Sequence, residues 1–377
     1  MVRQIQIDAP GHAGRQRLWF CAMSGLLGDL FGTRPLPPLS GRAMNYLDGK
    51  RVLVTGAAGS IGSELVRQLW QLTGEMPYIL DVDESRMHGL VLSLTDDGLL
   101  GGDRIVLADI RDRSRIDRVL RDVRPDVVFH AAANKHLTLL ERFPCEAVKT
   151  NVLGTEIVAS ACVRAGVERF VFVSTDKAAD PTSVLGATKR LGEMITQEHS
   201  CRVSAASVRF GNVLASRGSF LHILHRQMEQ NVPVTVTDPD VTRYFMSIPE
   251  AAQLVIEASS SAVNGDVYVL DMGEPVRIVD LVRRYAEHVG LPCPEIVFTG
   301  LRHGEKLHES LFASAEIAER SWHPRISVST PAPLRSNVVA ACGPLIEAAL
   351  AEDDELTTAT LFGLMPAMPR LPSLVTV

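Results

Sequence analysis

The chain has 377 residues, of which 46% are hydrophobic and 22% charged, the balance of an ordinary globular protein. A formal net charge of −6 argues against nonspecific binding to nucleic acid, which requires clustered lysine and arginine. The six cysteines are widely scattered and form no C-x-x-C pair. This pattern argues against a disulfide framework or a zinc site and favours reduced thiols, so we expect a cytoplasmic protein without a metal centre.

The stretch from Leu18 to Gly28 is apolar and follows Arg15 and Arg17, as in the core of a signal peptide. It is shorter than the roughly 20 residues that a membrane span needs, and it runs into Asp29 without a small-residue cleavage site. We therefore expect no membrane span, but a short amphipathic helix that packs on the body or on a second subunit. Residues 1–45 are assigned to this N-terminal extension.

From residue 46 onward, apolar runs of strand length alternate with longer amphipathic stretches. The predicted strands are Arg51–Thr55, Tyr78–Asp81, Arg104–Ala108, Val127–His130 and Phe170–Ser174. The predicted helices between them include Ser63–Leu72, Arg113–Val123 and Asn151–Ala165. This alternation predicts an α/β fold over residues 46–215, a doubly wound parallel sheet of the Rossmann type with helices on both faces.

The regular alternation weakens after about residue 215. A helix is predicted at Phe220–Gln230 and a short strand at Val232–Val236. We expect residues 216–330 to form a smaller α/β lobe that binds the substrate and is interleaved with the last strands of the sheet. Residues 331–377 are rich in alanine, proline and threonine, and we assign them to a C-terminal tail without firm structure.

A glycine-rich turn follows the first predicted strand and opens a helix. Gly56, Gly59 and Gly62 permit a tight turn, close approach of the backbone to a pyrophosphate, and close packing of helix on strand. Ser60 and Ile61 begin the helix, whose free N–H groups and positive dipole end face the phosphates. A plain structural turn is the alternative, but the strand before and the helix after the turn favour a dinucleotide site.

Further cofactor residues are predicted at the ends of the next strands. Asp81 stands about 20 residues beyond the glycines, where a carboxylate holds the adenosine ribose hydroxyls. It favours NAD over NADP, because a carboxylate repels a 2′-phosphate, although the nearby Arg86 keeps NADP as an alternative. The other candidates follow the third and fourth strands: Asp109, Ile110, Ala131 and Ala132.

The fifth predicted strand closes with Thr175, Asp176 and Lys177, so a hydroxyl, a carboxylate and an amine stand together at the ligand edge. A helix pattern that begins near Leu185 then carries Lys189. An adjacent Asp-Lys pair is usually an exposed surface ion pair. Its place after a buried strand, beside a predicted cofactor, favours an active site instead.

The glycine turn, the Ser-Thr-Asp-Lys run and the helix with Lys189 resemble the extended short-chain dehydrogenase/reductase superfamily. Four more stretches resemble its polysaccharide-biosynthesis branch, which contains UDP-N-acetylglucosamine 4,6-dehydratases: residues 130–136, 209–213, 242–246 and 300–306. The resemblance runs from about residue 26 to 325. It implies an NAD-dependent lyase that oxidises carbon 4 of a UDP-N-acetylhexosamine, eliminates water across carbons 5 and 6, and returns the hydride to carbon 6. The product is a UDP-2-acetamido-4-keto-2,6-dideoxyhexose.

The resemblance also implies roles for the reacting residues. Lys177 is the base at carbon 5, in a neutral form that burial or the neighbouring Lys189 would promote by lowering its pKa. Asp176 is the acid for the departing carbon-6 hydroxyl, and Thr175 hydrogen-bonds the carbon-4 hydroxyl. Lys189 binds the nicotinamide ribose.

The substrate site requires cationic clamps for a diphosphate. Arg243 and Arg302 are suited to this, because a guanidinium group binds phosphate oxygens bidentately. By resemblance, Asn212 donates to the diphosphate, Glu305 holds the uridine ribose and Lys135 approaches the sugar. We expect a homo-oligomer, either a dimer or a hexamer.

One position departs from the superfamily pattern. Leu185 stands four residues before Lys189, where the superfamily has a tyrosine that deprotonates the reacting hydroxyl. Branch members with methionine there retain the configuration at carbon 5, so Leu185 implies the retaining subgroup. It leaves the carbon-4 base open between Asp176 and a relay through Thr175. Two alternatives are a UDP-sugar 4- or 5-epimerase, which Leu185 opposes, and a noncatalytic nucleotide-sugar-binding protein, which the intact Asp176, Lys177 and Lys189 oppose.

Overall fold

The computed structural model describes residues 38–95, 102–214, 216, 218–330 and 337–365. The helix expected at residues 18–28 lies outside these residues. The described part begins with a short helix, α2 (Gly41–Leu47), whose first turn is capped where Ala43 N donates to Ser40 Oγ. No helix in the described ranges combines the length and the apolar character needed to cross a membrane.

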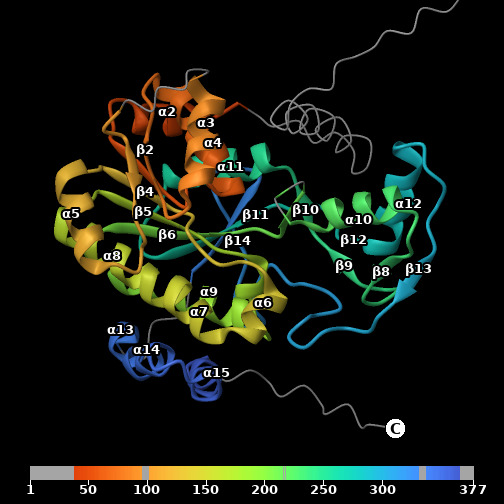
Figure 1. The fold of residues 1–377 in the computed structure, drawn as a ribbon. Helices are drawn as coiled ribbons and strands as arrows, with labels where there is room; N and C mark the ends of the chain where they lie inside the picture. Colours follow the sequence, from red (N-terminus) through yellow and green to blue (C-terminus); the bar gives the residue numbers. More distant parts are fainter. Residues whose placement is uncertain (1–37, 96–101, 215, 217, 331–336, 366–377) are drawn as a thin grey trace, which may run out of the picture.

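A mainly parallel sheet forms the centre of the molecule (Figure 1). Nine strands of the described residues belong to it: β1 (Val52–Thr55), β2 (Tyr78–Asp81), β3 (Ile105–Leu107), β4 (Val127–His130), β5 (Arg169–Val173), β6 (Ser204–Arg209), β11 (Asp266–Leu270), β14 (Glu319–Arg320) and β15 (Ile326–Ser329). Their order is β14-β15-β11-β6-β5-β4-β1-β2-β3, and β15 runs antiparallel to both of its neighbours. The doubly wound parallel sheet predicted from the sequence is confirmed.

Helices cover both faces of this sheet (Figure 1). On one face α2 packs with α3 (Ser60–Thr73), α4 (Glu84–Thr95) and α11 (Ile248–Ser259). On the other face α5 (Arg113–Val123) packs with α8 (Gly154–Ala165) and α9 (Val184–His199). Side chains on both faces of each central strand are therefore buried in a hydrophobic core, which explains why the strands appear in the sequence as continuous apolar runs.

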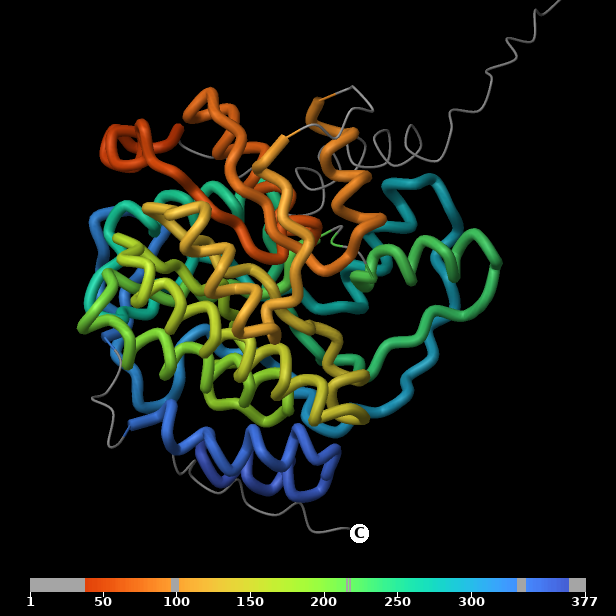
Figure 2. Tube along the Cα trace, turned by 60° about the vertical axis from the view of Figure 1, so that its left-hand side comes forward, coloured from red at the N-terminus to blue at the C-terminus, as the bar shows by residue number. Residues whose placement is uncertain are grey.

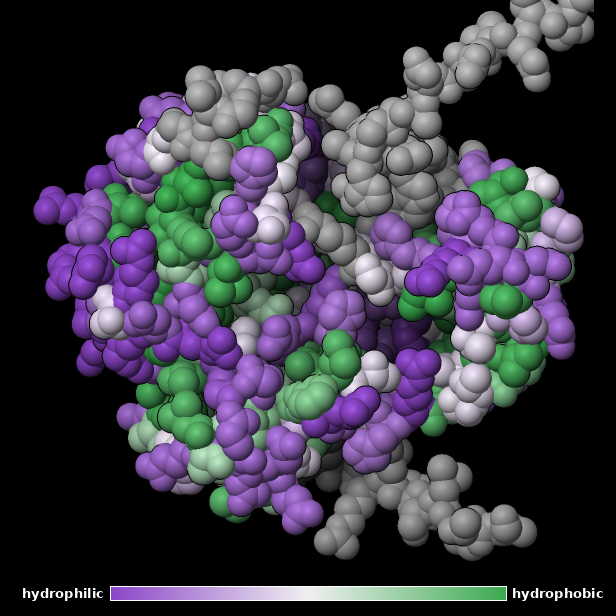
Figure 3. All heavy atoms as spheres, in the orientation of Figure 1, coloured by the Kyte–Doolittle hydropathy of each residue, from purple (hydrophilic) through white to green (hydrophobic). Residues whose placement is uncertain are grey.

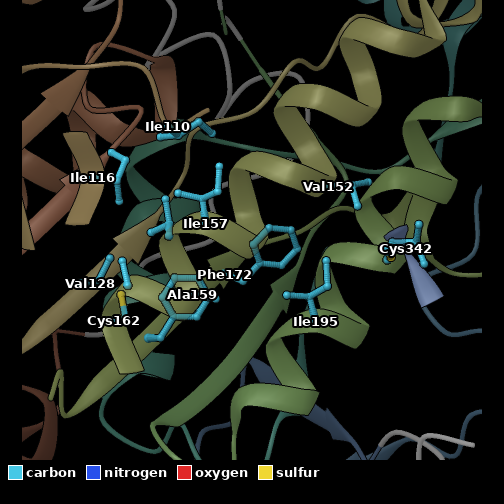
Figure 4. Close-up of a cluster of buried hydrophobic side chains, with 14 of the residues drawn as sticks. Ile110, Ile116, Val128, Val152, Ile157, Ala159, Cys162, Phe172, Ile195 and Cys342 are labelled. Atoms are coloured by element: carbon cyan, nitrogen blue, oxygen red, sulfur yellow. The ribbon is translucent and has the colours of Figure 1, made fainter. Parts of the chain in front are cut away.

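Strand β5 shows how one strand supplies two cores. Phe170 and Phe172 face the core beneath α8 and α9, whereas Val171 faces the core beneath α3 and α11, because successive side chains of a strand point to opposite faces. Figure 4 shows Phe172 among Ile157, Val152 and other buried side chains. A Cβ at Gly192 of α9 would overlap the Phe172 ring, so glycine there allows the helix to lie close to the sheet.

The order of the strands reverses at β1, which pairs in parallel with β2 on one side and with β4 on the other. In doubly wound sheets, ligands bind in the crevice that opens at the carboxyl ends of the strands at this switch point. The residues that follow β1, β4 and β5 in this structure are Gly56, Ala131 and Ser174. The topology thus brings together segments that are more than 100 residues apart in the chain.

A smaller lobe extends from this crevice, made of residues 218–246 and 276–298 (Figure 1). Its core lies between α10 (Phe220–Glu229), α12 (Ile278–His288) and short strand pairs. The pairs are β8 (Val234–Val236) with β13 (Ile296–Phe298), and β9 (Thr242–Arg243) with β12 (Val276–Arg277). A further pair, β7 (Asn212–Val213) with β10 (Phe245–Met246), lies where the lobe joins the sheet. Hydrophilic side chains border the recess between the lobe and the main body (Figure 3).

The C-terminal region is helical between residues 338 and 363, so the expectation of a tail without firm structure is wrong there. Three helices form it: α13 (Val338–Ala341), α14 (Gly343–Leu350) and α15 (Asp354–Gly363). They pack beneath α9 and α7 (Pro144–Val148), as Figure 2 shows. Helices this short are marginal in isolation and give little periodic signal. Burial of Leu345 and Leu361, both 0% exposed, stabilises them instead.

Leu345 and Leu350 of α14 provide a matched test of this packing. Leu345 is 0% exposed and Leu350 is 60% exposed. We expect Leu345→Ala to lower the free energy of unfolding by about 2–5 kcal/mol, since it leaves a cavity, and Leu350→Ala to change it by less than about 0.5 kcal/mol. Denaturant unfolding measures both; equal effects would contradict a packed C-terminal helix.

Candidate functional site

The glycine turn joins β1 to α3 at the carboxyl edge of the sheet. Gly56 has a φ of +67°, and a Cβ there would lie 2.5 Å from the backbone nitrogen of Ala132. A Cβ at Gly62 would overlap the carbonyl oxygen of Gly56. Helix α3 begins at Ser60, and its N-cap Gly59 supplies no side chain to the first turn. The first turn of α3 therefore begins at the glycine turn, and N–H groups of a first helical turn have no partner within their own helix.

Asp81, the last residue of β2, fixes this turn with its carboxylate. Its Oδ2 accepts a hydrogen bond from Ala58 N at 2.9 Å. Its Oδ1 accepts from Val82 N at 2.8 Å and from Asp83 N at 3.0 Å. The carboxylate that the sequence analysis assigns to the adenosine ribose is thus held in one orientation beside the glycine turn.

The other predicted cofactor residues differ in whether their side chains are exposed, buried or paired. The backbone of Ala131 and Ala132 borders Gly56, and Ile61 packs partly buried against the core beneath α3. The carboxylate of Asp109 forms an ion pair with Arg111 at 2.7 Å. Ile110 is 5% exposed, and its side chain packs on Gly154, so any contact of Ile110 with a ligand has to come from its backbone.

His130, the last residue of β4, lies buried beneath the crevice as a neutral side chain. Its Nδ1 is 2.7 Å from Thr55 Oγ1 and its Nε2 is 3.1 Å from Thr155 Oγ1. Since the Thr155 hydroxyl donates its proton to Asn151 O, it accepts from Nε2–H, and Nδ1 accepts from Thr55. Burial, aided by the charge of Lys189, lowers the pKa of His130 to about 3.

Thr175, Asp176 and Lys177 follow β5 as a hydrogen-bonded cluster. Thr175 Oγ1 donates to Asp176 Oδ1 at 2.9 Å, and Lys177 Nζ donates to the same oxygen at 2.9 Å. Lys177 Nζ also donates to Asn212 Oδ1 at 3.3 Å. Asp176 is 0% exposed, and its Oδ2 has no hydrogen-bond partner among the described atoms. A buried oxygen in that state is suited to accept a proton or a hydrogen bond from a ligand.

The pKa of Lys177 does not follow the sequence-based expectation. Burial lowers it, but the attraction of the Asp176 and Glu309 carboxylates outweighs burial, and the pKa is raised above its ordinary value. The expected lowering of this pKa by burial or by Lys189 is therefore wrong for this arrangement. Lys177 rests as an ammonium group and must pass a proton on before it acts as a base.

Lys189 lies beneath the cluster on α9, where the sequence predicts it. Its Nζ donates to Val173 O at 2.8 Å and lies 4.6 Å from the centre of the Phe172 ring. Burial lowers its pKa to about 8, against the opposing attraction of Glu193. Leu185, one turn earlier, is 5% exposed and belongs to the core, so this position contributes packing and no proton transfer.

A π-helical turn before α8, η1 (Lys149–Leu153), ties the crevice to α9. Such turns are rare in proteins overall, and those that occur are often found at functional sites. Asn151 Oδ1 accepts from Asn134 N at 2.8 Å, and its Nδ2 donates to Asn134 O at 3.0 Å and to Thr188 Oγ1 at 3.1 Å. The sequence analysis did not assign Asn151 or Thr188 to the site, although Thr188 directly precedes Lys189.

The predicted substrate residues divide into a paired and an exposed group. Arg243 donates to Glu305 Oε1 at 2.8 Å and to Leu307 O at 3.2 Å, so two predicted residues lie in contact with each other. Arg302 and Lys135 are exposed. Lys135 Nζ lies 3.5 Å from Ser216 Oγ. Of the five, Asn212 is hydrogen-bonded to the Thr175–Lys177 cluster, through Lys177 Nζ.

A buried ion-pair network contacts Ser174, the residue that precedes the Thr175–Lys177 cluster. Arg209 of β6 is 0% exposed and donates to Glu193 at 2.6 Å and to Glu316 at 2.6 Å. Glu193 Oε1 also accepts from Ser174 Oγ at 2.6 Å. The network thus links β6, α9 and residues 313–316 to the residue before Thr175, and removing one partner would leave an uncompensated buried charge.

The fold and the site together define a Rossmann-type protein of the extended short-chain dehydrogenase/reductase class. More narrowly, the chain belongs to the polysaccharide biosynthesis protein family, whose profile matches residues 52–331. It is 43% identical over 307 residues to the probable polysaccharide biosynthesis protein EpsC of Bacillus subtilis, which covers 80% of this chain and 51% of EpsC. The chain thus spans about half the length of the curated relatives it matches.

Epimerases are also among its relatives, and solved structures share its fold. A UDP-glucose 4-epimerase of Rickettsia rickettsii is 33% identical over 280 residues, which cover 72% of this chain and 80% of the epimerase. The solved structure of Pen from Bacillus thuringiensis has a TM-score of 0.68 at 30% identity and covers 77% of this chain and 90% of Pen. DesIV of Streptomyces venezuelae, a dTDP-glucose 4,6-dehydratase with NAD bound, shares the fold with a TM-score of 0.61 at 23% identity, over 70% of this chain and 88% of DesIV.

His130 gives the site a measurable pH dependence. Its pKa is about 3 when folded and about 6.5 in an unfolded chain, so below pH 6.5 the unfolded state binds a proton that the folded state excludes. The free energy of unfolding should therefore fall by about 1.4 kcal/mol per pH unit from this residue between about pH 6.5 and pH 3. Denaturant unfolding at several pH values should show that His130→Asn lacks this slope; identical slopes would contradict a neutral buried histidine.

Proposed function

We propose that this chain is an NAD-dependent UDP-N-acetylglucosamine 4,6-dehydratase. The observation that carries the proposal is the cluster of Thr175, Asp176 and Lys177, a hydroxyl, a carboxylate and an amine hydrogen-bonded to one another at the carboxyl end of β5. The reaction needs an acid and a base held close to one sugar ring. The family and the dehydratase among the related structures support the assignment.

The glycine turn fits the pyrophosphate of NAD. A Cβ at Gly56 or at Gly62 would fill the space in which the backbone approaches its neighbours, and the first turn of α3 supplies N–H donors to a phosphate. We assign Asp81 to the adenosine ribose hydroxyls and Lys189 to the nicotinamide ribose. Bound NAD supplies the hydride acceptor for carbon 4 and the hydride donor for carbon 6.

Thr175 and Asp176 are arranged to remove the proton of the carbon-4 hydroxyl. The Thr175 hydroxyl donates to Asp176 Oδ1 and accepts a long hydrogen bond from Lys177 N at 3.5 Å, so it keeps one lone pair to accept from the sugar. We assign the carbon-4 base to this relay: the sugar hydroxyl protonates Thr175 as Thr175 protonates Asp176. Asp176 is then a neutral acid, and it protonates the carbon-6 hydroxyl as water leaves.

Lys177 removes the carbon-5 proton, which the carbon-4 ketone makes acidic, and later returns it to carbon 5. No second proton-transferring side chain stands at position 185, because Leu185 is apolar and buried. Return of the proton by the residue that removed it keeps the configuration at carbon 5. The same feature weighs against a 5-epimerase, which needs proton transfer on both faces of the ring, and against a 4-epimerase, which needs a proton-transferring residue at position 185.

The UDP moiety is assigned to the recess between the main body and the smaller lobe (Figure 3). Asn212 connects this recess to the cluster through Lys177. Arg302 and Lys135 are exposed cations suited to the diphosphate and the sugar. The Arg243–Glu305 pair positions the loop that carries Arg302, so Arg243 has to exchange part of that pairing to bind a phosphate itself.

The cofactor assignment can be tested with two glycines of similar backbone conformation. Gly56 has a φ of +67° and Gly49 a φ of +68°, but a Cβ at Gly49 meets nothing within 4 Å. We expect Gly56→Ala to weaken NAD binding at least about tenfold beyond any loss in Gly49→Ala, because the two share the backbone strain and only Gly56→Ala blocks the crevice. Titration calorimetry with NAD measures this; equal affinities would remove the glycine turn from the cofactor site.

The reaction can be tested with UDP-N-acetylglucosamine in deuterated water. We expect loss of one water, a new carbon-6 methyl group, deuterium at carbon 5 and retained configuration there, seen by mass spectrometry and proton NMR. Lys177→Met and Asp176→Asn should each lower kcat by about 100-fold or more, because each removes a proton-transfer group. Lys50→Met, which changes a surface lysine paired with Glu168, should keep full activity. An unchanged sugar would contradict the proposed activity on this substrate.

A further inference from the structure

Glu309 lies against the amine of Lys177 and was not assigned to the site from the sequence. Its side chain is 3% exposed, and its Oε1 is 3.7 Å from Lys177 Nζ, within ion-pair range but longer than a hydrogen bond. Its Oε2 has no hydrogen-bond partner among the described atoms. A buried carboxylate is costly unless it is compensated, so the placement of Glu309 calls for a function.

The segment that carries Glu309 is fixed on both sides. Before it, Lys306 Nζ donates to Ala179 O at 2.8 Å, which joins the segment to the loop after Lys177. After it, Arg209 Nη1 donates to Leu311 O at 3.4 Å. These two hydrogen bonds anchor the segment on either side of Glu309, and the anchored segment directs the Glu309 side chain toward Lys177.

The proposed reaction requires acceptors for two protons before the carbon-5 proton is removed. One leaves the carbon-4 hydroxyl and passes through Thr175 to Asp176. The other is on Lys177, which rests as an ammonium group and must become an amine to act as a base. A carboxylate oxygen pair takes up one proton in this pH range, so Asp176 cannot accept both.

Within the described residues, Asp176 and Glu309 are the carboxylates that pair with Lys177 Nζ. The other groups that face Lys177 are unsuited to accept its proton. Asn212 offers an amide oxygen, and Arg243 is a cation that opposes the charge of Lys177. Lys306, a second amine near this cluster, has a pKa that burial lowers against the attraction of Glu309 and Asp176, and its Nζ is held by Ala179 O.

We propose that Glu309 is a positioning residue that accepts the proton of Lys177 at the start of each catalytic cycle. The two side chains first close from 3.7 Å to hydrogen-bond distance. An N–H bond of Lys177 then breaks and an O–H bond forms on Glu309, with no change in oxidation state. The free amine then takes the carbon-5 proton and returns it. When the product leaves, the proton on Glu309 goes back to Lys177. The inference rests on the proposed dehydratase function and names the group that receives the proton of Lys177.

The first test is the pH profile of kcat from about pH 6.5 to pH 9.5. In the wild type the proton moves within the site, so kcat should change little with pH. In Glu309→Gln, Lys177 has to lose its proton to solvent, so kcat should be at least about tenfold lower near pH 7 and rise toward the wild-type value by about tenfold per pH unit. Glu309→Asp, which keeps the carboxylate, should restore the flat profile. A constant ratio between Glu309→Gln and wild type at every pH overturns the proposal.

The second test does not depend on turnover. Acylation of lysine amines by acetic anhydride, mapped by mass spectrometry at one pH, proceeds in proportion to the neutral fraction of each lysine. Loss of the neighbouring anion in Glu309→Gln should make Lys177 react at least about tenfold faster, whereas Glu309→Asp should leave its rate close to that of the wild type. The buried Lys189 is the internal standard, because a general loosening of the fold would change its rate as well.

Glu168→Gln is the matched control, since Glu168 lies 2.8 Å from Lys50 on the surface. It should change neither kcat nor the labelling of Lys177. Equal labelling of Lys177 in the wild type and in Glu309→Gln overturns the proposal. If the wild type makes no product from UDP-hexoses, the proposed function fails, and the labelling still decides whether Glu309 controls the proton on Lys177.

Discussion

Parallel pairing of β1 with both β2 and β4 is the constraint on which the site depends. Parallel strands end at the same edge of a sheet, and the reversal of strand order at β1 opens a crevice there. The glycine turn after β1 can then lie against the backbone after β4, so closely that Gly56 has no room for a side chain. Both the glycine turn, which we assign to a pyrophosphate, and the cluster after β5 are attached to this edge.

The charged side chains buried near this edge are each paired with groups of opposite charge, and the completeness of the pairing differs between two clusters. Asp176 and Glu309 flank Lys177, and Glu193 and Glu316 flank Arg209. The Arg209 network is closed, because guanidinium forks satisfy both carboxylates. The Lys177 cluster is open, because one oxygen of Asp176 and one of Glu309 lack partners among the described atoms. The closed network supports the fold, and the open one is able to exchange protons.

Local patterns predicted most of the sheet and the glycine turn. The strands at residues 78–81 and 127–130 and the helix at 113–123 have the bounds expected from their apolar periods. The prediction failed where long-range contacts decide the outcome. Helices α13 to α15 form because they bury leucines against α7 and α9. Glu309 was missed because it stands three residues beyond a motif that ended at Lys306, and its sequence gives no sign that it meets Lys177.

The sequence by itself determined the class of fold, the glycine turn and the Thr-Asp-Lys run, because each depends on neighbouring residues and on a period of two or 3.6 residues. It also showed that Leu185 replaces a proton donor. Only the tertiary structure decided the proton state of Lys177, since this depends on a carboxylate 132 positions away in the chain. Burial alone would lower the pKa of that lysine, and the two carboxylates packed against it raise the pKa instead.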